Sequence, residues 1–77
     1  MPTVLESRGY SFRFRMADCE EPPHIHVTGN GGSAKVWLAP VRVAWFRAYN
    51  AGAVGEILVI TRAHQAEWLD RWNEVCR

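Results

Sequence analysis

Two histidines, His24 and His26, stand two residues apart in the stretch EPPHIHV. Imidazole suits acid–base chemistry near neutral pH, because its unperturbed pKa of about 6.5 keeps both protonation states accessible. In a β-strand the two rings project to the same side, roughly 7 Å apart between Cα atoms. The prolines before His24 fix φ and lack N–H groups, which suits the start of a strand or a sheet edge. The spacing therefore predicts a pair of imidazoles on one side of a sheet.

In the flanking segments, alternation along each predicted strand places cationic and aromatic side chains on the same side of the sheet as the two histidines. Residues 10–16, YSFRFRM, alternate between apolar and polar, so two arginines share the polar side of a half-buried strand. A lysine and a tryptophan in AKVWL, and an arginine two residues after Pro40, can join them. The candidate binding residues on this predicted face are Arg13, Arg15, His24, His26, Lys35, Trp37 and Arg42.

Such a face allows several kinds of chemistry besides simple solvation, which is the default for polar residues. Arginine and lysine contact phosphates and Trp37 can stack on a base, which favours binding of RNA, DNA or an acidic protein. A metal-independent ribonuclease is an alternative, with His24 and His26 as candidate catalytic groups. Glu20 or Glu21 could complete a zinc site, but catalytic zinc usually takes three protein ligands and nearby arginines oppose a dication. We therefore expect no metal and no cofactor.

The segment that carries the histidines predicts a β-hairpin. Asn30-Gly31 is a favoured type I′ turn pair between two alternating runs. Counting outward from this turn sets His24 opposite Trp37 and His26 opposite Lys35, with every apolar pair on the other face. A turn at Gly31-Gly32 would move the register by two residues and keep the same faces.

The rest of the chain supplies further strands and then a helix. Residues 3–6 can pair with residues 10–16 through a turn at Gly9. Residues 41–46 alternate Val41, Val43 and Trp45 with Arg42, Ala44 and Phe46, which predicts a strand; a short helix that starts at Pro40 is the alternative. From residue 51 the apolar period becomes helical up to residue 75, with Asn50 as the N-cap and a break near Ala63–His64 conceivable.

These elements predict an α+β fold in a single domain, residues 1–77. A small antiparallel sheet of four to five strands, within residues 3–46, is expected to be covered on one face by a long C-terminal helix of about residues 51–76. The histidine face is then the uncovered side, in contact with water.

Composition bounds the function without defining it. The chain has 77 residues, 48% of them hydrophobic, and a net charge of +1, which gives no global reason to bind nucleic acid or a membrane. Apolar runs such as Ile57–Ile60 have four residues and are too short to span a bilayer. Cys19 and Cys76 stand far apart with no secretory segment, which favours two reduced thiols in a cytoplasmic protein over one long-range disulfide.

The motifs MPTV, EPPHIHV, AKVWL followed by PV, and LDRWNEV together resemble the bacterial family catalogued as domain of unknown function 4160. The likeness covers nearly the whole chain, and His24, His26, Lys35 and Trp37 fall on its signature motifs. The resemblance implies a protein encoded in bacteria and mobile elements, often beside a second small gene of unknown function, and sometimes described as a possible toxin–antitoxin component. The segment AGAVGEILVITRAHQAEW is more apolar than the charged segment usual in the family.

The leading hypothesis is therefore a soluble interaction module, such as half of a toxin–antitoxin-like pair, that uses the histidine face on nucleic acid or on an acidic protein. A cognate small protein is a further expected partner, and Leu58–Ile60 allows a homodimer contact. The alternatives are the ribonuclease toxin and a protein-only inhibitor or adaptor, such as a phage or mobile-element blocker of a host complex. The adaptor would use the acidic segment 18–21 or the apolar helix surface.

Overall fold

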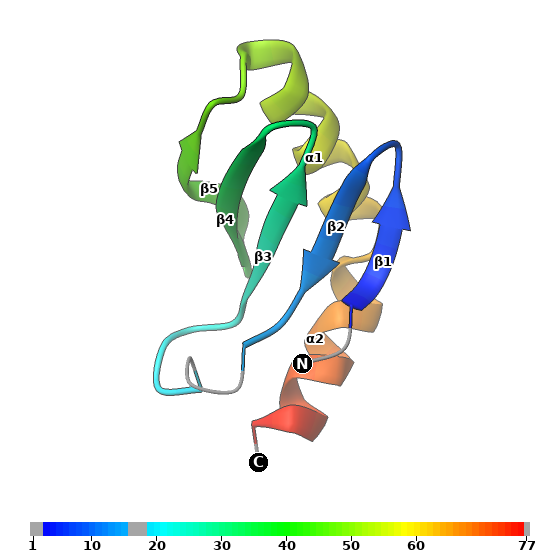
Figure 1. Ribbon diagram of the computed structural model, residues 1–77. Coiled ribbons are helices and arrows are strands. Elements are labelled where there is room, and N and C mark those ends of the chain that lie inside the picture. Colours follow the sequence, from blue (N-terminus) through cyan, green and yellow to red (C-terminus); the bar gives the residue numbers. More distant parts are fainter. Residues whose placement is uncertain (1–2, 16–18, 77) are drawn as a thin grey trace.

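The computed structural model describes residues 3–15 and 19–76 (Figure 1). Five strands precede two helices: β1 (Thr3–Ser7), β2 (Tyr10–Arg13), β3 (His24–Gly29), β4 (Gly32–Leu38), β5 (Val41–Arg47), α1 (Ala51–Ala63) and α2 (Gln65–Val75). Each strand pairs antiparallel with the next in the order β1-β2-β3-β4-β5, and both helices lie behind the sheet in Figure 1. The chain is therefore α+β with a five-stranded antiparallel sheet. No helix in the described ranges is long and apolar enough to cross a bilayer.

The β3–β4 hairpin has the predicted register. His24 lies opposite Trp37 and His26 opposite Lys35. Asn30 has a φ of 51° and the following glycine a φ of 84°, which is the backbone that a type I′ turn requires. The turn between β1 and β2 also has two positive φ values, at residues 8 and 9, and it packs beside this one: the Asn30 side-chain amide donates to the carbonyl of Arg8 over 3.0 Å.

One face of the sheet is apolar and packs against the helices. Its buried side chains alternate along the strands as predicted and form one cluster with residues of both helices. The Phe12 ring lies 5.2 Å from the ring of Trp68, and the Phe14 ring lies 5.8 Å from that of Trp72. These contacts hold α2 against β2 and against Phe14, which follows β2 directly.

The single C-terminal helix predicted for residues 51–76 is instead two helices. Asn50 caps α1 as predicted, since its side chain accepts from the backbone N–H of Ala53 over 2.8 Å. At His64 the backbone leaves the helical conformation (φ −113°, ψ 9°), and its N–H bonds to Thr61. A straight helix of 25 residues would be about 37 Å long. The longest dimension of the molecule is 34 Å, so the break keeps the helical segment within the extent of the fold.

Strand β5 forms after Pro40, and the alternative of a short helix there was wrong. The register shifts within its pairing to β4, so that Val43 lies opposite Val36 whereas Trp45 lies opposite Lys35. The shift leaves Ala44 as an extra residue and inverts the parity of the strand residues after it. The expectation that Trp45 shares a face with Val43 was therefore wrong.

The two cysteines are paired, which corrects the prediction of two reduced thiols. Cys19 and Cys76 form a disulfide across a sequence separation of 57 residues, with their Cα atoms 5.3 Å apart. The bond joins the segment before β3 to the end of α2. Spacing along the chain could not reveal this pairing, because only the packing of α2 against the sheet brings the two residues together.

Candidate functional site

The candidate site lies on the sheet face turned away from the helices. Cross-strand pairing joins Arg13, His26, Lys35 and Trp45 into one row across β2 to β5. Direct cross-strand partners project to the same side of a sheet. The row beside it contains His24, Trp37 and Arg42, and the row on the other side ends in Arg47 opposite Ser33. We call this surface the basic face: Arg13, His24, His26, Lys35, Trp37, Arg42, Trp45 and Arg47.

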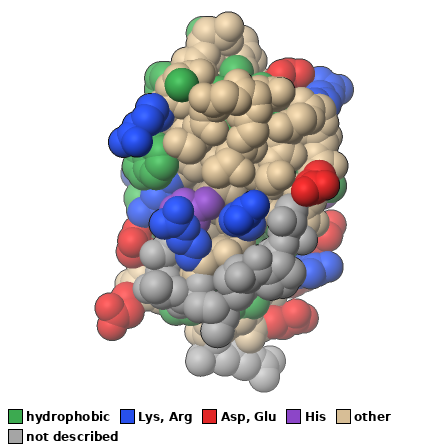
Figure 2. All heavy atoms as spheres, in the orientation of Figure 1, with side chains coloured by type: hydrophobic (Ala, Val, Ile, Leu, Met, Phe, Trp, Pro, Cys, Tyr) green, Lys and Arg blue, Asp and Glu red, His purple; other side chains and the backbone are tan. Residues whose placement is uncertain are grey.

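Figure 2 shows Lys and Arg side chains on both sides of a histidine side chain on this face. Arg13, Arg42 and Arg47 are exposed, and Trp45 has 44% of its surface in water. Arg15 is also exposed, but β2 ends at Arg13, so no strand pairing places Arg15 on the face. The structure thus brings together six of the seven predicted residues and adds two that the sequence did not predict. The β5 bulge, which has no clear sequence signal, sets Trp45 on this side.

The expectation that both histidines face water was wrong. His24 is fully buried and only 7% of His26 is exposed. The His24 ring lies 5.0 Å from the ring of His26, 5.7 Å from Trp37 and 5.0 Å from Trp72 of α2. For His24 the reason is tertiary: α2 extends past the end of the sheet, where β2 has already ended, and Trp72 reaches the His24 ring there.

One hydrogen bond sets the tautomer of His24. Its Nδ1 lies 2.9 Å from the carbonyl oxygen of Pro22. A carbonyl only accepts, so Nδ1 carries the proton and donates. This contact also ties the ring to the segment that enters β3, which leaves the imidazole in a structural role as part of an aromatic cluster.

Lys35 is held by two contacts at the centre of the basic face. Its ammonium group forms an ion pair with the carboxylate of Glu21 and lies 4.6 Å over the ring of Trp37. The Lys35 side chain is only 14% exposed, against 43% for Glu21. A cation–π contact is stronger when the cation is partly desolvated, as here. The arginines are therefore the cations of this face that are offered to water.

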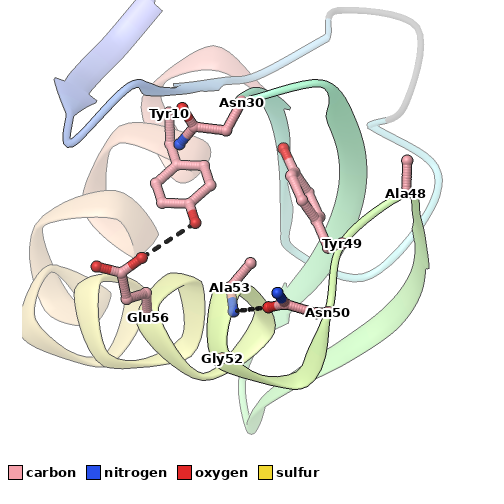
Figure 3. Close-up of a pocket in the computed structure, with 8 residues that line it drawn as sticks. All are labelled: Tyr10, Asn30, Ala48, Tyr49, Asn50, Gly52, Ala53 and Glu56. Carbon is pink, nitrogen blue, oxygen red and sulfur yellow. Dashed lines mark hydrogen bonds between the residues drawn. The ribbon is translucent and has the colours of Figure 1, made fainter.

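A hollow of about 530 Å³ lies at the opposite end of the sheet, between the two hairpin turns and the start of α1 (Figure 3). Figure 3 shows the hydroxyl of Tyr10 pointing to Glu56, to which it donates over 3.1 Å. Arg8 donates to the same carboxylate over 3.0 Å, and Tyr49 donates to the carbonyl of Gly29 over 2.8 Å. The bonds of Arg8 and Tyr10 to Glu56 tie the β1–β2 turn and β2 to α1, and the bond of Tyr49 ties the residue after β5 to the end of β3.

The surroundings of this hollow raise the pKa of both tyrosines that line it. Burial raises the pKa of Tyr10, and the hydrogen bond and negative charge of Glu56 raise it further. Burial likewise raises the pKa of Tyr49, whose ring lies 5.8 Å from that of Tyr10.

Within residues 3–15 and 19–76, no three His, Cys, Asp or Glu side chains are grouped as metal ligands would be.

Fold and surface together define a small α+β protein with a basic sheet face and a buried histidine pair. Residues 9–73 match the family described as domain of unknown function (DUF4160), and the chain belongs to that family. The resemblance expected from the EPPHIHV and AKVWL motifs is therefore confirmed. No curated protein and no solved structure matched the chain.

Proposed function

We propose that this protein is a small interaction module that binds single-stranded nucleic acid through the basic face. The observation that carries the proposal is the position of Trp45, which is 44% exposed on the edge strand β5 and shares its sheet face with three exposed arginines. Guanidinium groups bind phosphates without regard to sequence, and an exposed indole gives an unpaired base a surface on which to stack.

The dimensions of the face suit a short stretch of chain. Arg13 on β2 and Trp45 on β5 are separated by three strand spacings, about 14 Å in total. Arg42 and Arg47 lie on β5 on either side of Trp45. A strand of nucleic acid lying along β5 could thus stack on the indole while its backbone meets an arginine at each end.

Fluorescence anisotropy with labelled oligouridylate, oligothymidylate and a duplex of equal length tests the proposal across a salt series. Two phosphate contacts, at Arg42 and Arg47, predict a slope of log K against log salt of about −1.4, from about −0.7 per contact for single strands. Arg42→Ala should reduce the slope by about 0.7, and Trp45→Ala should weaken binding by about 1–3 kcal/mol. Arg62→Ala is the matched control, because Arg62 is exposed on α1 and its substitution removes the same charge.

Three results would count against this function: no binding at low salt, binding that ignores salt, or equal losses for Arg42→Ala and Arg62→Ala. Capture only of a co-expressed neighbouring gene product, in nuclease-treated lysate, would instead favour an acidic protein partner. That outcome would fit the toxin–antitoxin-like pair suggested by the family resemblance.

The buried histidines give less support to a ribonuclease. General acid–base catalysis requires an imidazole within hydrogen-bond reach of the substrate. His24 is fully buried and His26 nearly so, whereas the arginines and Trp45 are open. If expression of the protein proves harmful, His26→Ala should leave that harm unchanged.

A further inference from the structure

The acidic segment before β3 is fastened to the basic face at several points. We call residues 19–23, CEEPP, the strap. At one end Cys19 is bonded covalently to Cys76 after α2. At the other end the carbonyl of Pro23 accepts from the N–H of Leu38 over 3.0 Å, which continues the pairing of β4 beyond β3. The strap is thus fixed both to the helix layer and to the sheet.

Between these two anchors, Glu21 reaches the centre of the basic face. Its carboxylate pairs with the ammonium group of Lys35, which lies in the same row as Arg13 and Trp45. Lys35 lies directly opposite Trp45, so its ammonium group would add to the positive charge that a strand lying along β5 meets. The carboxylate of Glu21 neutralises this charge and therefore lowers the net positive charge of the face beside β5.

The ion pair between Glu21 and Lys35 would by itself hold the strap only weakly on the basic face. Glu21 is 43% exposed, and partly exposed ion pairs are weak and are screened by salt. The contact is intramolecular in both redox states, and Glu21 is tethered to β3 on one side through Pro22 and Pro23. The covalent bond at Cys19 fixes the other side of the same short segment, which raises the effective concentration of the carboxylate near Lys35. Cutting the bond would lengthen the free segment and lower this concentration.

We infer that the Cys19–Cys76 disulfide controls access to the basic face, by holding Glu21 on Lys35 when it is oxidised and releasing the strap when it is reduced. The inference rests on the proposed function for its ligand, a nucleic-acid phosphate, but the movement of the strap can be measured without any ligand. Oxidised protein is the weaker binder and reduced protein the stronger one.

The redox step is an ordinary thiol–disulfide exchange with a dithiol reductant. Cys19 is exposed, so a thiolate of the reductant can attack its sulfur and expel Cys76 as the leaving thiolate. The second thiol of the reductant then displaces Cys19 from the mixed disulfide. Two electrons and two protons pass to the protein, which ends with two thiols, and the reductant ends as a disulfide.

Lys35 is the only lysine in the chain, so it reports on the strap directly. Labelling with an amine-reactive ester, followed by peptide mass spectrometry, measures the accessibility of its ammonium group separately from the N-terminal amine. Reduction with dithiothreitol should speed the labelling of Lys35 by about fivefold, the factor expected for loss of an ion pair at the upper end of partly exposed pairs. Circular dichroism recorded in parallel establishes that the reduced protein remains folded at the temperature used.

Variants separate the strap from the stability of the fold. Cys19→Ser should label at the rate of reduced wild type and ignore dithiothreitol. Glu21→Gln should label fast with the disulfide intact, which tests the inference even if Cys19→Ser does not fold. Glu20→Gln is the matched control, because it removes the neighbouring exposed carboxylate and should keep the slow, redox-dependent rate of wild type.

Anisotropy with oligouridylate, measured in both redox states, completes the experiment. Unchanged Lys35 labelling in folded, reduced protein overturns the inference, whatever the binding result. Faster labelling with equal binding in the two states also overturns it, because access would then not control the face. Faster labelling with no binding in either state leaves the movement of the strap established and refutes the proposed function, so the two failures are distinguishable.

Discussion

Removing the disulfide should lower the stability of this protein substantially. A cross-link stabilises mainly by restricting the unfolded chain, and the effect grows with the length of the closed loop. For a separation of 57 residues the chain-entropy relation gives about 4 kcal/mol at 25 °C. A chain of 77 residues has an unfolding entropy of about 160 cal/mol/K, so this free energy corresponds to a fall in Tm of up to about 25 °C.

Thermal unfolding followed by tryptophan fluorescence measures this loss in oxidised wild type, in reduced wild type and in Cys76→Ser. The reduced protein and the variant should unfold at the same temperature, about 15–25 °C below the oxidised protein. Dithiothreitol should not shift the variant further, which controls for other effects of the reductant. Equal unfolding temperatures for oxidised and reduced wild type would refute the reasoning, as would two titratable thiols in native protein purified without reductant.

Two further predictions concern the hairpin turns and the hollow beside them. Gly29→Ala should cost about 3 kcal/mol in urea unfolding, because Gly29 has a φ of 116° and an added Cβ would collide with the carbonyl of Gly9. Gly31→Ala should cost only about 1 kcal/mol, since its φ is 84° but the space beside it is open, and equal losses would show that the turns do not pack together. Tyr10 and Tyr49, the only tyrosines, should ionise above pH 10 in native protein and near pH 10 in denaturant, as followed by phenolate absorbance. Their raised pKa values stabilise the folded state below pH 10, and this stability is lost as pH rises past that value. Ionisation of one tyrosine near pH 10 in the native protein would contradict the packing in the hollow.

Much of the sheet was predictable because its determinants are local. The Asn30-Gly31 pair fixes a type I′ turn, and the turn fixes which residues face one another along β3 and β4. Strict alternation over residues 10–13 set the apolar side chains of β2 toward the core. The N-cap at Asn50 depends only on its own side chain and the next three residues.

The sequence predicted most of the residues of the candidate site, but it did not predict how deeply each side chain is buried or what it contacts. Parity placed Arg13, Lys35 and Arg42 on one face, and the strand pairing agrees. The alternation along each strand does not predict which side chains from other parts of the chain pack against that face. The burial of His24 depends on Trp72, which is 48 residues away in sequence and reaches the ring only because α2 packs past the end of the sheet.

By itself, then, the sequence determined the register of the β3–β4 hairpin, the chemistry of its turn and the sidedness of β2, β3 and β4, since each depends on the backbone preferences of residues a few positions apart. Only the tertiary structure decided that the histidines are buried, that Trp45 joins the basic face, and that Cys19 meets Cys76. These outcomes arise from a bulge in β5, from the position of α2 and from contacts between distant segments. Such contacts are fixed by how whole elements pack, and no periodicity along the chain encodes them.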